Sequence, residues 1–563
     1  MLIRVLESTA RLWPGPVSVD DELDRALAFV GADVDGETVH RASYAAAVAL
    51  AVMGFVATTA TRSTPIVAAP FLALATAVAV GGPVVPLALA RAKRTRALGS
   101  APSLVTRAAL SMELAPSPER AAQFAAATSE GALASSLDAH VRRSAAGPET
   151  GFAGFVAEWK PWFPALERAC TLVESAGTVP ADQRSATLER ARGTVLDATR
   201  DRMADFAGSI RGPATAVYAF GVLLPLALVS LLPALRAAGL PAPLRIVALV
   251  YDLLLPLCLL GASVWLLARR PVAFPPTTVQ RSHPDVPARR WPGPLVGCLA
   301  AALSWWTASL VFPPWATPVA VTGTGAGATL VVHYRPIVQV RESVSEVEDG
   351  LSDALALLGR RVERGESVES AVAGVADDVP GPTGELLAAA ARRQRLLGVG
   401  VETAFLGPNG ALEAIPSDRV RSSATLLALA AAEGPPAGAA VTAMGEHLQE
   451  LAAVEAEARR SVEQVTRTLA NTAAIFGPLV GGATVALAGA MGSAGPLASG
   501  GAADGLGLVV GAYVLVLAAI LTALSTGLSR GFDRALVGYR VGLALLAATA
   551  TYLAAFVGTG LTV

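Results

Sequence analysis

The sequence predicts an all-α, polytopic membrane protein that carries two large helical lobes outside the bilayer. Of its 563 residues, 53% are hydrophobic and 16% are charged, and the mean hydropathy of +0.52 does not suit a large soluble protein. Apolar runs long enough to cross a bilayer alternate with charge-rich helical stretches. The order of these segments repeats along the chain, so we expect a duplicated architecture.

Nine spans are predicted from the apolar runs. They are expected at 44–60, 65–90, 214–235, 245–268, 294–312, 316–333, 472–491, 506–528 and 538–557. The predicted order of segments is an acidic amino-terminal segment (1–42), spans one and two (43–90), a first helical lobe (91–213), spans three and four (214–268), a basic linker (269–293), spans five and six (294–333), a second helical lobe (334–471) and spans seven to nine (472–563).

The distribution of arginine predicts the topology. The loops expected outside hold three arginines, Arg62, Arg236 and Arg245, whereas the loops expected inside hold nearly all the others. The positive-inside rule then places the amino terminus and both lobes in the cytosol and the carboxyl terminus outside the cell membrane. The acidic first segment lacks the apolar core of a signal peptide.

One amphipathic helix in the second lobe is expected to enter the membrane without a break. Its apolar residues recur at three- and four-residue steps and therefore share one helix face. They are Leu448, Leu451, Val454, Ala458, Val462, Val465 and Leu469. Because no turn signal separates them from the span 472–491, about 46 residues would form one rod of roughly 69 Å. A similar pattern ends the first lobe and runs toward the span 214–235.

Short stretches match between the two halves at an offset of about 250 residues. Residues 113–119 lie over 363–369, and Pro225 lies near Pro478. Arg211, ten residues before Gly221, lies over Arg467, ten residues before Gly477. The ninth span is then an addition to the second half.

These features resemble a known family. The second lobe contains Gly-Glu-Ser-Val-Glu-Ser-Ala-Val (365–372) and Ala-Glu-Gly-Pro-Pro (432–436), and its last helix enters the membrane at Phe-Gly-Pro-Leu-Val (476–480). This layout resembles the F-domain of type II secretion and type IV pilus systems. The duplication and the acidic first segment are similar to archaeal pilus and archaellum platform proteins. The first lobe departs from the pattern, because Ala115 stands where the second lobe has Gly365, so the two lobes need not bind the same partner.

The resemblance implies a membrane platform at the base of a filament, with a hexameric secretion ATPase beneath it and pilin-like subunits beside it. Membrane lipids and a second copy of the chain are further expected partners. The resemblance implies that nucleotide chemistry belongs to the ATPase, and the sequence has no Gly-x-x-x-x-Gly-Lys-Ser/Thr motif. We therefore expect no enzymatic activity and no cofactor. The net charge of -1 gives no reason to expect nucleic-acid binding.

The candidate docking surface for the ATPase is acidic. Residues 335–471 hold 13 basic and 20 acidic side chains, whereas residues 91–213 hold 16 basic and 13 acidic ones. The hypothesis is that acids of the second lobe dock a basic face of the ATPase, and the alternative is a solvated, salt-adapted surface. The acids are Glu363, Glu366, Glu369, Asp377 and Asp378. The candidate coupling residues are Arg211, Gly221, Pro225, Arg467, Gly477, Pro478 and Gly481.

Other residues offer little chemistry. The three cysteines have no metal-ligand spacing and are expected to be buried small hydrophobes, and the five histidines are expected at surfaces or interfaces. Gly323, Gly325 and Gly327 lie in an apolar span, so close helix packing is the expected role rather than dinucleotide binding. Gly477 and Gly481 invite the same interpretation, with a sliding helix seam as the alternative.

Asp252 is an acid well inside a predicted span. It is either a proton or ion relay or a group that snorkels to the outer interface, about two turns away, or pairs locally with Arg245. The alternative function for the whole chain is a secondary transporter with an internal repeat. A membrane-bound enzyme is a weaker rival because no catalytic constellation is present.

Overall fold

The structure is a computed structural model that describes residues 2–17, 21–32, 34–61, 68–129, 131–144, 151–237, 244–270, 279, 283–284, 286–287, 289, 291–433, 437–493, 501–531 and 533–562. Within these residues the chain is 87% helix and has no strand, which confirms the all-α prediction. Most of the expected turns at 61–64 and 236–244 (residues 62–64 and 238–243), much of the basic linker, and Gly-Pro-Pro of the 432–436 motif lie outside the described residues.

Eight segments of the described chain are long and apolar enough to cross a membrane, which is consistent with a multi-pass membrane protein. In chain order these segments involve α3 (Gly36–Thr61), α4 (Ala69–Leu98), α10 to α11 (Ala181–Tyr218 to Leu224–Ala237), α12 to α13 (Leu244–Ala248 to Leu255–Arg269), α14 (Pro292–Val311), α20 to α21 (Ala437–Asn471 to Gly477–Ser493), α22 (Gly501–Arg530) and α23 (Arg534–Thr562). The expected sixth span, 316–333, is not among them, because threonine and glycine interrupt its apolar residues.

The first lobe has an aromatic core. It is formed by α5 (Ala101–Leu114), α6 (Pro118–Thr128), α7 (Ala132–Ser144), α8 (Gly151–Trp159), α9 (Pro164–Ser175) and the first half of α10. Phe152, Phe155, Trp159 and Phe163 are buried at its centre. Leu104, Val105, Ala108 and Met112 give α5 one apolar face that packs on them, as a helix with this spacing must.

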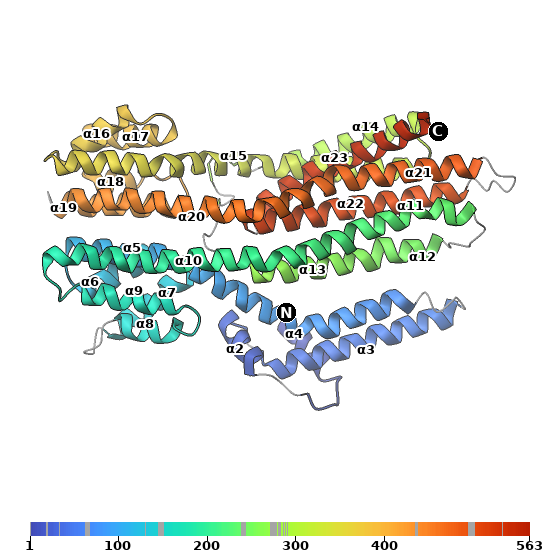
Figure 1. Ribbon diagram of the computed structural model, residues 1–563, viewed down its shortest axis with the longest axis horizontal. Helices are drawn as coiled ribbons and strands as arrows, with labels where there is room; N and C mark the ends of the chain where they lie inside the picture. Colours follow the sequence, from blue (N-terminus) through green and yellow to red (C-terminus); the bar gives the residue numbers. More distant parts are fainter. Residues whose placement is uncertain are drawn as a thin grey trace.

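The second lobe has an aliphatic core. It is formed by the second half of α15 (Ala316–Glu363), α16 (Val368–Asp378), α17 (Pro382–Leu397), α18 (Val401–Leu406), α19 (Asp418–Glu433) and the first half of α20. Leu351, Leu355 and Leu358 of α15 pack in the same core as Met444 and Leu448 of α20. Figure 1 shows both lobes at one end of the molecule and the apolar helices at the other.

The repeat is visible in matched local geometry. Ser117 caps α6 and Ser367 caps α16, and in each case the side-chain oxygen accepts a hydrogen bond of 3.3 Å from the backbone N–H three residues later. Both helices have 11 residues, and their positions differ by 250. The approach to each cap differs, because Gly365 has a φ of +92°, whereas Ala115 is extended at −136°.

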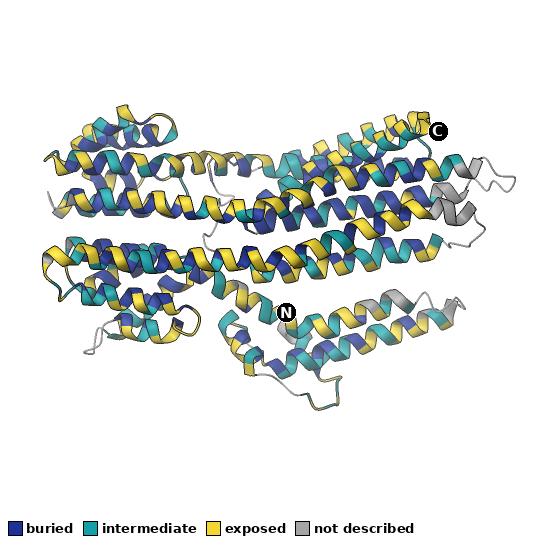
Figure 2. Ribbon diagram, viewed as in Figure 1, coloured by how far each residue is buried: buried dark blue, intermediate teal, exposed yellow. Residues whose placement is uncertain are grey.

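The apolar helices form a bundle around α22, and one helical hairpin stands apart from it. Tyr513, Leu517 and Leu521 of α22 are buried in the bundle core, which also includes residues of α11, α13, α21 and α23. The first half of α15 packs between α14 and α23. By contrast, α3 and α4 pair mainly with each other and with α1 (Leu2–Ala10) and α2 (Asp21–Val30), and in the described chain their main contact with the bundle is along α13 and the π-helix before it, η3 (Leu249–Leu254). Figure 2 colours many residues of this hairpin as exposed and most described residues of α22 as buried.

Candidate functional site

The acids predicted to dock a partner gather at one corner of the second lobe, far from the apolar bundle. Glu363 ends α15, Glu366 lies in the turn, and Glu369, Asp377 and Asp378 belong to α16. Figure 1 places α16 at the end of the molecule opposite the apolar helices. The structure therefore brings all five acids to one surface.

Arg361 forms ion pairs with two of these acids. Its guanidinium lies 2.8 Å from Asp378 and 3.5 Å from Glu366. The hydrogen bond to Asp378 and the charge of Glu366 raise the pKa of Arg361. Glu363 accepts a hydrogen bond from Thr442 at 3.1 Å. Glu369 and Asp377 are exposed and form no ion pair with the described residues, so they are the acids free to meet a partner.

The candidate coupling residues lie where two lobe helices continue into apolar helices of the bundle without a break. α10 continues through a short π-helix, η2 (Ala219–Leu223), into α11, and α20 continues through η4 (Thr472–Phe476) into α21. The continuous passage expected from the sequence is confirmed. Arg211 and Arg467 are exposed on the lobe side of each passage.

A proline follows each π-helix by two residues. Pro225 follows η2, Pro478 follows η4, and Pro256 follows η3 (Leu249–Leu254), which separates α12 from α13. Proline lacks an N–H and clashes with the carbonyl four residues earlier, so an extra residue in the turn lets the helix continue. Aligning the π-helices and prolines gives an offset of 253 residues. Gly477 therefore corresponds to Leu224 and not, as the arginine spacing suggested, to Gly221.

Tyrosine hydroxyls satisfy backbone groups at these interruptions. The Tyr513 hydroxyl donates a hydrogen bond of 2.9 Å to the carbonyl of Gly221, the group that Pro225 cannot reach. The Tyr251 hydroxyl donates to the carbonyl of Pro225 at 2.8 Å. The two rings meet edge to face with centroids 5.3 Å apart. An unpaired carbonyl costs several kcal/mol in lipid, so these bonds support the irregular backbone.

The small residues permit close packing, as predicted. A Cβ on Gly323 would lie 2.0 Å from Thr549, and one on Gly327 would lie 2.9 Å from the carbonyl of Gly542. A Cβ on Gly221 would meet Leu259 at 2.3 Å. Gly481 lies against Val510, Val514 and Tyr552. Gly482, which the sequence analysis did not single out, approaches the backbone of Tyr552 even more closely, since its Cβ would lie 2.2 Å from that carbonyl.

Asp252 lies in η3, and its Oδ1 is buried without a hydrogen-bond partner in the described part of the chain. No ion pair with Arg245 forms among those residues, so the expected local pairing is not observed.

Cys170 is buried as expected, but Cys258 and Cys298 are exposed on apolar helices. The described residues contain no group of three or more His, Cys, Asp or Glu side chains that could hold a metal ion.

The two lobes meet at a buried polar contact that the sequence did not reveal. The Thr106 hydroxyl of α5 lies 2.8 Å from Nε2 of His447 on α20. Beside it, Arg419 pairs with Glu455 at 3.1 Å and with Glu348 at 3.7 Å. Burial raises the pKa of Glu348, and the charge of Arg419 and a hydrogen bond from Ser417 oppose this shift. The sequence signal was only a histidine on an otherwise apolar helix face.

Comparison with known proteins finds no match to any family, curated protein or solved structure. The functional argument therefore depends on the chain itself.

Proposed function

We propose that this protein is the membrane platform of a type IV pilus-like machine, coupling a cytosolic secretion ATPase to the insertion of pilin-like subunits. The proposal includes nine spans, which are the eight candidate segments and, as the sixth span in chain order, the first half of α15, because it packs between two apolar helices. It also includes a cytosolic amino terminus and two cytosolic lobes. The single observation that carries it is the continuous helical passage from each lobe into the bundle at η2 and η4.

The mechanism is mechanical. A lobe that the ATPase displaces would move the helix that continues into the bundle, because a helix transmits force along its axis. The spans would then lift or admit a pilin-like subunit. This route needs no cofactor or catalytic residue in the platform.

Charge reversal tests the docking surface. Glu369→Lys combined with Asp377→Lys should weaken co-purification with a secretion ATPase from the same cell, most clearly at low salt, because exposed charges are screened at high salt. Glu457→Lys, which reverses an exposed acid elsewhere on the second lobe, is the matched control. Equal recovery of the ATPase with all variants would contradict docking at this surface.

A cross-link tests the mechanical step. Thr106→Cys with His447→Cys places two thiols across the lobe contact, in a background without the three native cysteines. Oxidation should stop filament growth while membrane insertion stays normal, and reduction should restore growth. Growth that continues with the lobes locked together would contradict a mechanism based on lobe movement.

A secondary transporter is the second candidate, because an unpartnered buried carboxylate and interrupted helices are typical of transport sites. Asp252 and the three π-helices are the observations that favour it. Solute uptake into vesicles that depends on an ion gradient and is lost in Asp252→Asn would support the transporter over the platform.

A further inference from the structure

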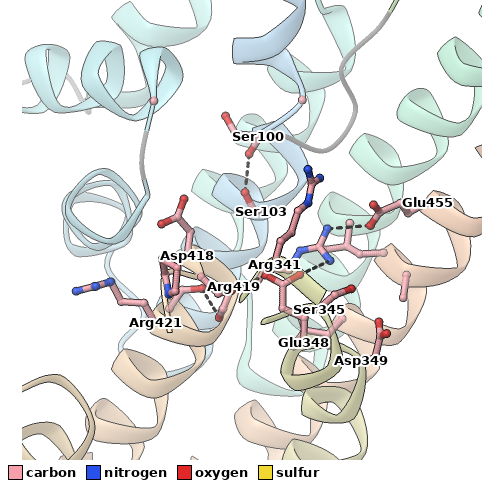
Figure 3. Close-up of a pocket in the computed structure, with 18 of the residues that line it drawn as sticks. Ser100, Ser103, Arg341, Ser345, Glu348, Asp349, Asp418, Arg419, Arg421 and Glu455 are labelled. Carbon is pink, nitrogen blue, oxygen red and sulfur yellow. Dashed lines mark hydrogen bonds and ion pairs between the residues drawn. The ribbon is translucent and has the colours of Figure 1, made fainter. Parts of the chain in front are cut away.

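A cavity of about 1730 Å³ lies between the two lobes where they meet the bundle. One wall is the end of α4 and the start of α5, and the opposite wall is formed by α15, α19 and α20. Arg530, at the end of α22, lines the side nearest the bundle. Figure 3 shows Ser100 and Ser103 of the first wall across from Ser345 and Glu348 of the second.

The cavity is positively charged although the second lobe is acidic. Nine lysine and arginine side chains and six carboxylates line it. Residues 335–471 as a whole hold 20 acids against 13 bases. The second lobe contributes five of these bases and all six acids, and the positive balance comes from Lys93, Arg96 and Arg107 of the first wall together with Arg530.

Two of the six lining carboxylates, those that are least exposed, already form ion pairs with arginines. Glu348 and Glu455 pair with Arg419, and Glu455 also pairs with Arg459. Their side chains are 14% and 21% exposed, respectively. Four other lining carboxylates are exposed and form no ion pair in the described chain; they are Glu342, Asp349, Glu413 and Asp418.

Two arginines on different parts of the cavity have no such partner. Arg96 of α4 and Arg530 of α22 are exposed to the cavity and form no ion pair with any described residue. Arg270 lies near Arg530, because it donates a hydrogen bond of 2.8 Å to the carbonyl of Leu528. Burial and then the charge of Arg459 lower the pKa of Arg270 to about 10, and the charge of Glu455 opposes this shift.

We propose that the inter-lobe cavity binds a phosphate-bearing anion, with Arg96 and Arg530 among its ligands. Guanidinium groups match the geometry of phosphate oxygens and bind them with charge-assisted hydrogen bonds. Both arginines belong to helices that continue into candidate spans, which places the site near the level of lipid headgroups. Basic pockets between membrane helices bind anionic headgroups for this reason. The source is either such a headgroup or a soluble phosphate compound.

The test uses the full chain in nanodiscs and distinguishes these sources. One arm measures retention of phosphatidylglycerol by native mass spectrometry after reconstitution in mixed phosphatidylglycerol and phosphatidylcholine. The other arm titrates tripolyphosphate by calorimetry into protein held in phosphatidylcholine alone. We expect saturable binding in one arm. Since each basic residue near a membrane contributes a factor of about five, Arg96→Gln with Arg530→Gln should weaken binding roughly 25-fold.

Two further variants make the result specific. Arg534→Gln removes an exposed arginine four residues beyond Arg530 that does not line the cavity, and binding should change less than about twofold. Arg96→Lys with Arg530→Lys keeps both charges but loses the guanidinium geometry, so binding should weaken by less than with the two glutamine substitutions but should not stay at the level of the unaltered protein. Circular dichroism checks that each variant stays folded. Binding in the lipid arm alone identifies a headgroup site, and binding in the phosphate arm identifies a soluble ligand. No saturable binding in either arm, or equal loss in Arg534→Gln, overturns the proposal.

Discussion

The two halves of the molecule each begin with a pair of apolar helices, but the two pairs differ in how much they pack against the rest of the bundle. The α14–α15 pair is built into the bundle, whereas in the described chain the α3–α4 pair contacts it mainly along α13 and η3. The difference comes from α23, which packs along α15 and α21 and has no counterpart in the first half. A duplicated sequence plan therefore does not give two equivalent halves, because one added helix decides which pair is fixed.

The α15–α23 contact should be the most sensitive point in this comparison. A side chain at Gly542 would collide with the carbonyl of Gly327, since even a Cβ would lie 2.9 Å from it. Gly542→Leu should lower the free energy of unfolding by about 3 kcal/mol and release the α14–α15 pair. Thermal unfolding in detergent, followed by circular dichroism, measures the loss.

Gly558→Leu is the matched control, because Gly558 lies on the same helix as Gly542 and a Cβ there would meet nothing within 4 Å. Equal destabilisation by both variants would show that α23 does not fix α15 through this close approach.

The lobes, unlike the helical pairs, are joined to each other, and acid should weaken that junction. Burial, with repulsion from Arg192, Arg419 and Arg107, lowers the pKa of His447 to about 3. An unfolded histidine titrates near 6.5. The stabilising contribution of the neutral ring is therefore complete above about pH 6.5 and is lost as pH falls toward 3.

Between pH 6.5 and pH 5 this loss should reach about 2 kcal/mol, at 1.36 kcal/mol for each pH unit. Thermal unfolding across this range measures it. His447→Gln keeps a polar side chain beside Thr106 but cannot gain this charge, so its stability should depend less on pH. The same pH dependence in both proteins would place its origin elsewhere.

The two lobe-to-bundle passages also differ. Among the described residues, a tyrosine hydroxyl donates a hydrogen bond to the backbone of η2, and none donates to the backbone of η4. Tyr513 donates to Gly221 in η2. Tyr513→Phe should cost about 1 kcal/mol and speed hydrogen exchange in η2 but not in η4. Tyr539→Phe, on α23, serves as the control. Faster exchange at both π-helices would indicate a general loosening of the bundle.

The matched serine caps should show the smallest effects and the closest agreement between the halves. Ser117→Ala and Ser367→Ala each remove a 3.3 Å capping bond. Each should cost about 0.5–1 kcal/mol, measured as faster hydrogen exchange in the first turn of α6 or α16. A much larger effect in one lobe would mean that the repeat preserves the cap geometry but not its energetic role.

Much of this architecture could be predicted from local sequence. Apolar runs and helical spacing gave the all-α fold and the continuous passages at residues 214 and 472. The expected span 316–333 showed the limit of hydropathy, since its glycines and threonines lower its hydropathy while the same glycines allow it to pack closely on α14 and α23. Charge counting located the acids around α16, but it could not show that Arg361 already holds Asp378 and Glu366.

The remaining features depend on residues that are distant in sequence. Thr106 and His447 are 341 positions apart, and Tyr513 and Gly221 are 292 apart. Neither pair carries a local signal. The prolines at 225, 256 and 478 were a partial signal for the π-helices, because a proline inside an apolar run must disturb the backbone before it.

The π-helices η2 and η4 each contain one extra residue between a lobe and the bundle. If the extra residue were expelled, the helix on one side would advance by about 1.5 Å and turn by roughly 100° relative to the other. Pro225 and Pro478 block travel of the bulge deeper into the bundle, so it can migrate only toward the lobe. At each of these two junctions, a small axial slip of the helix toward or away from the lobe would therefore rotate it and change which of its faces meets the neighbouring helices.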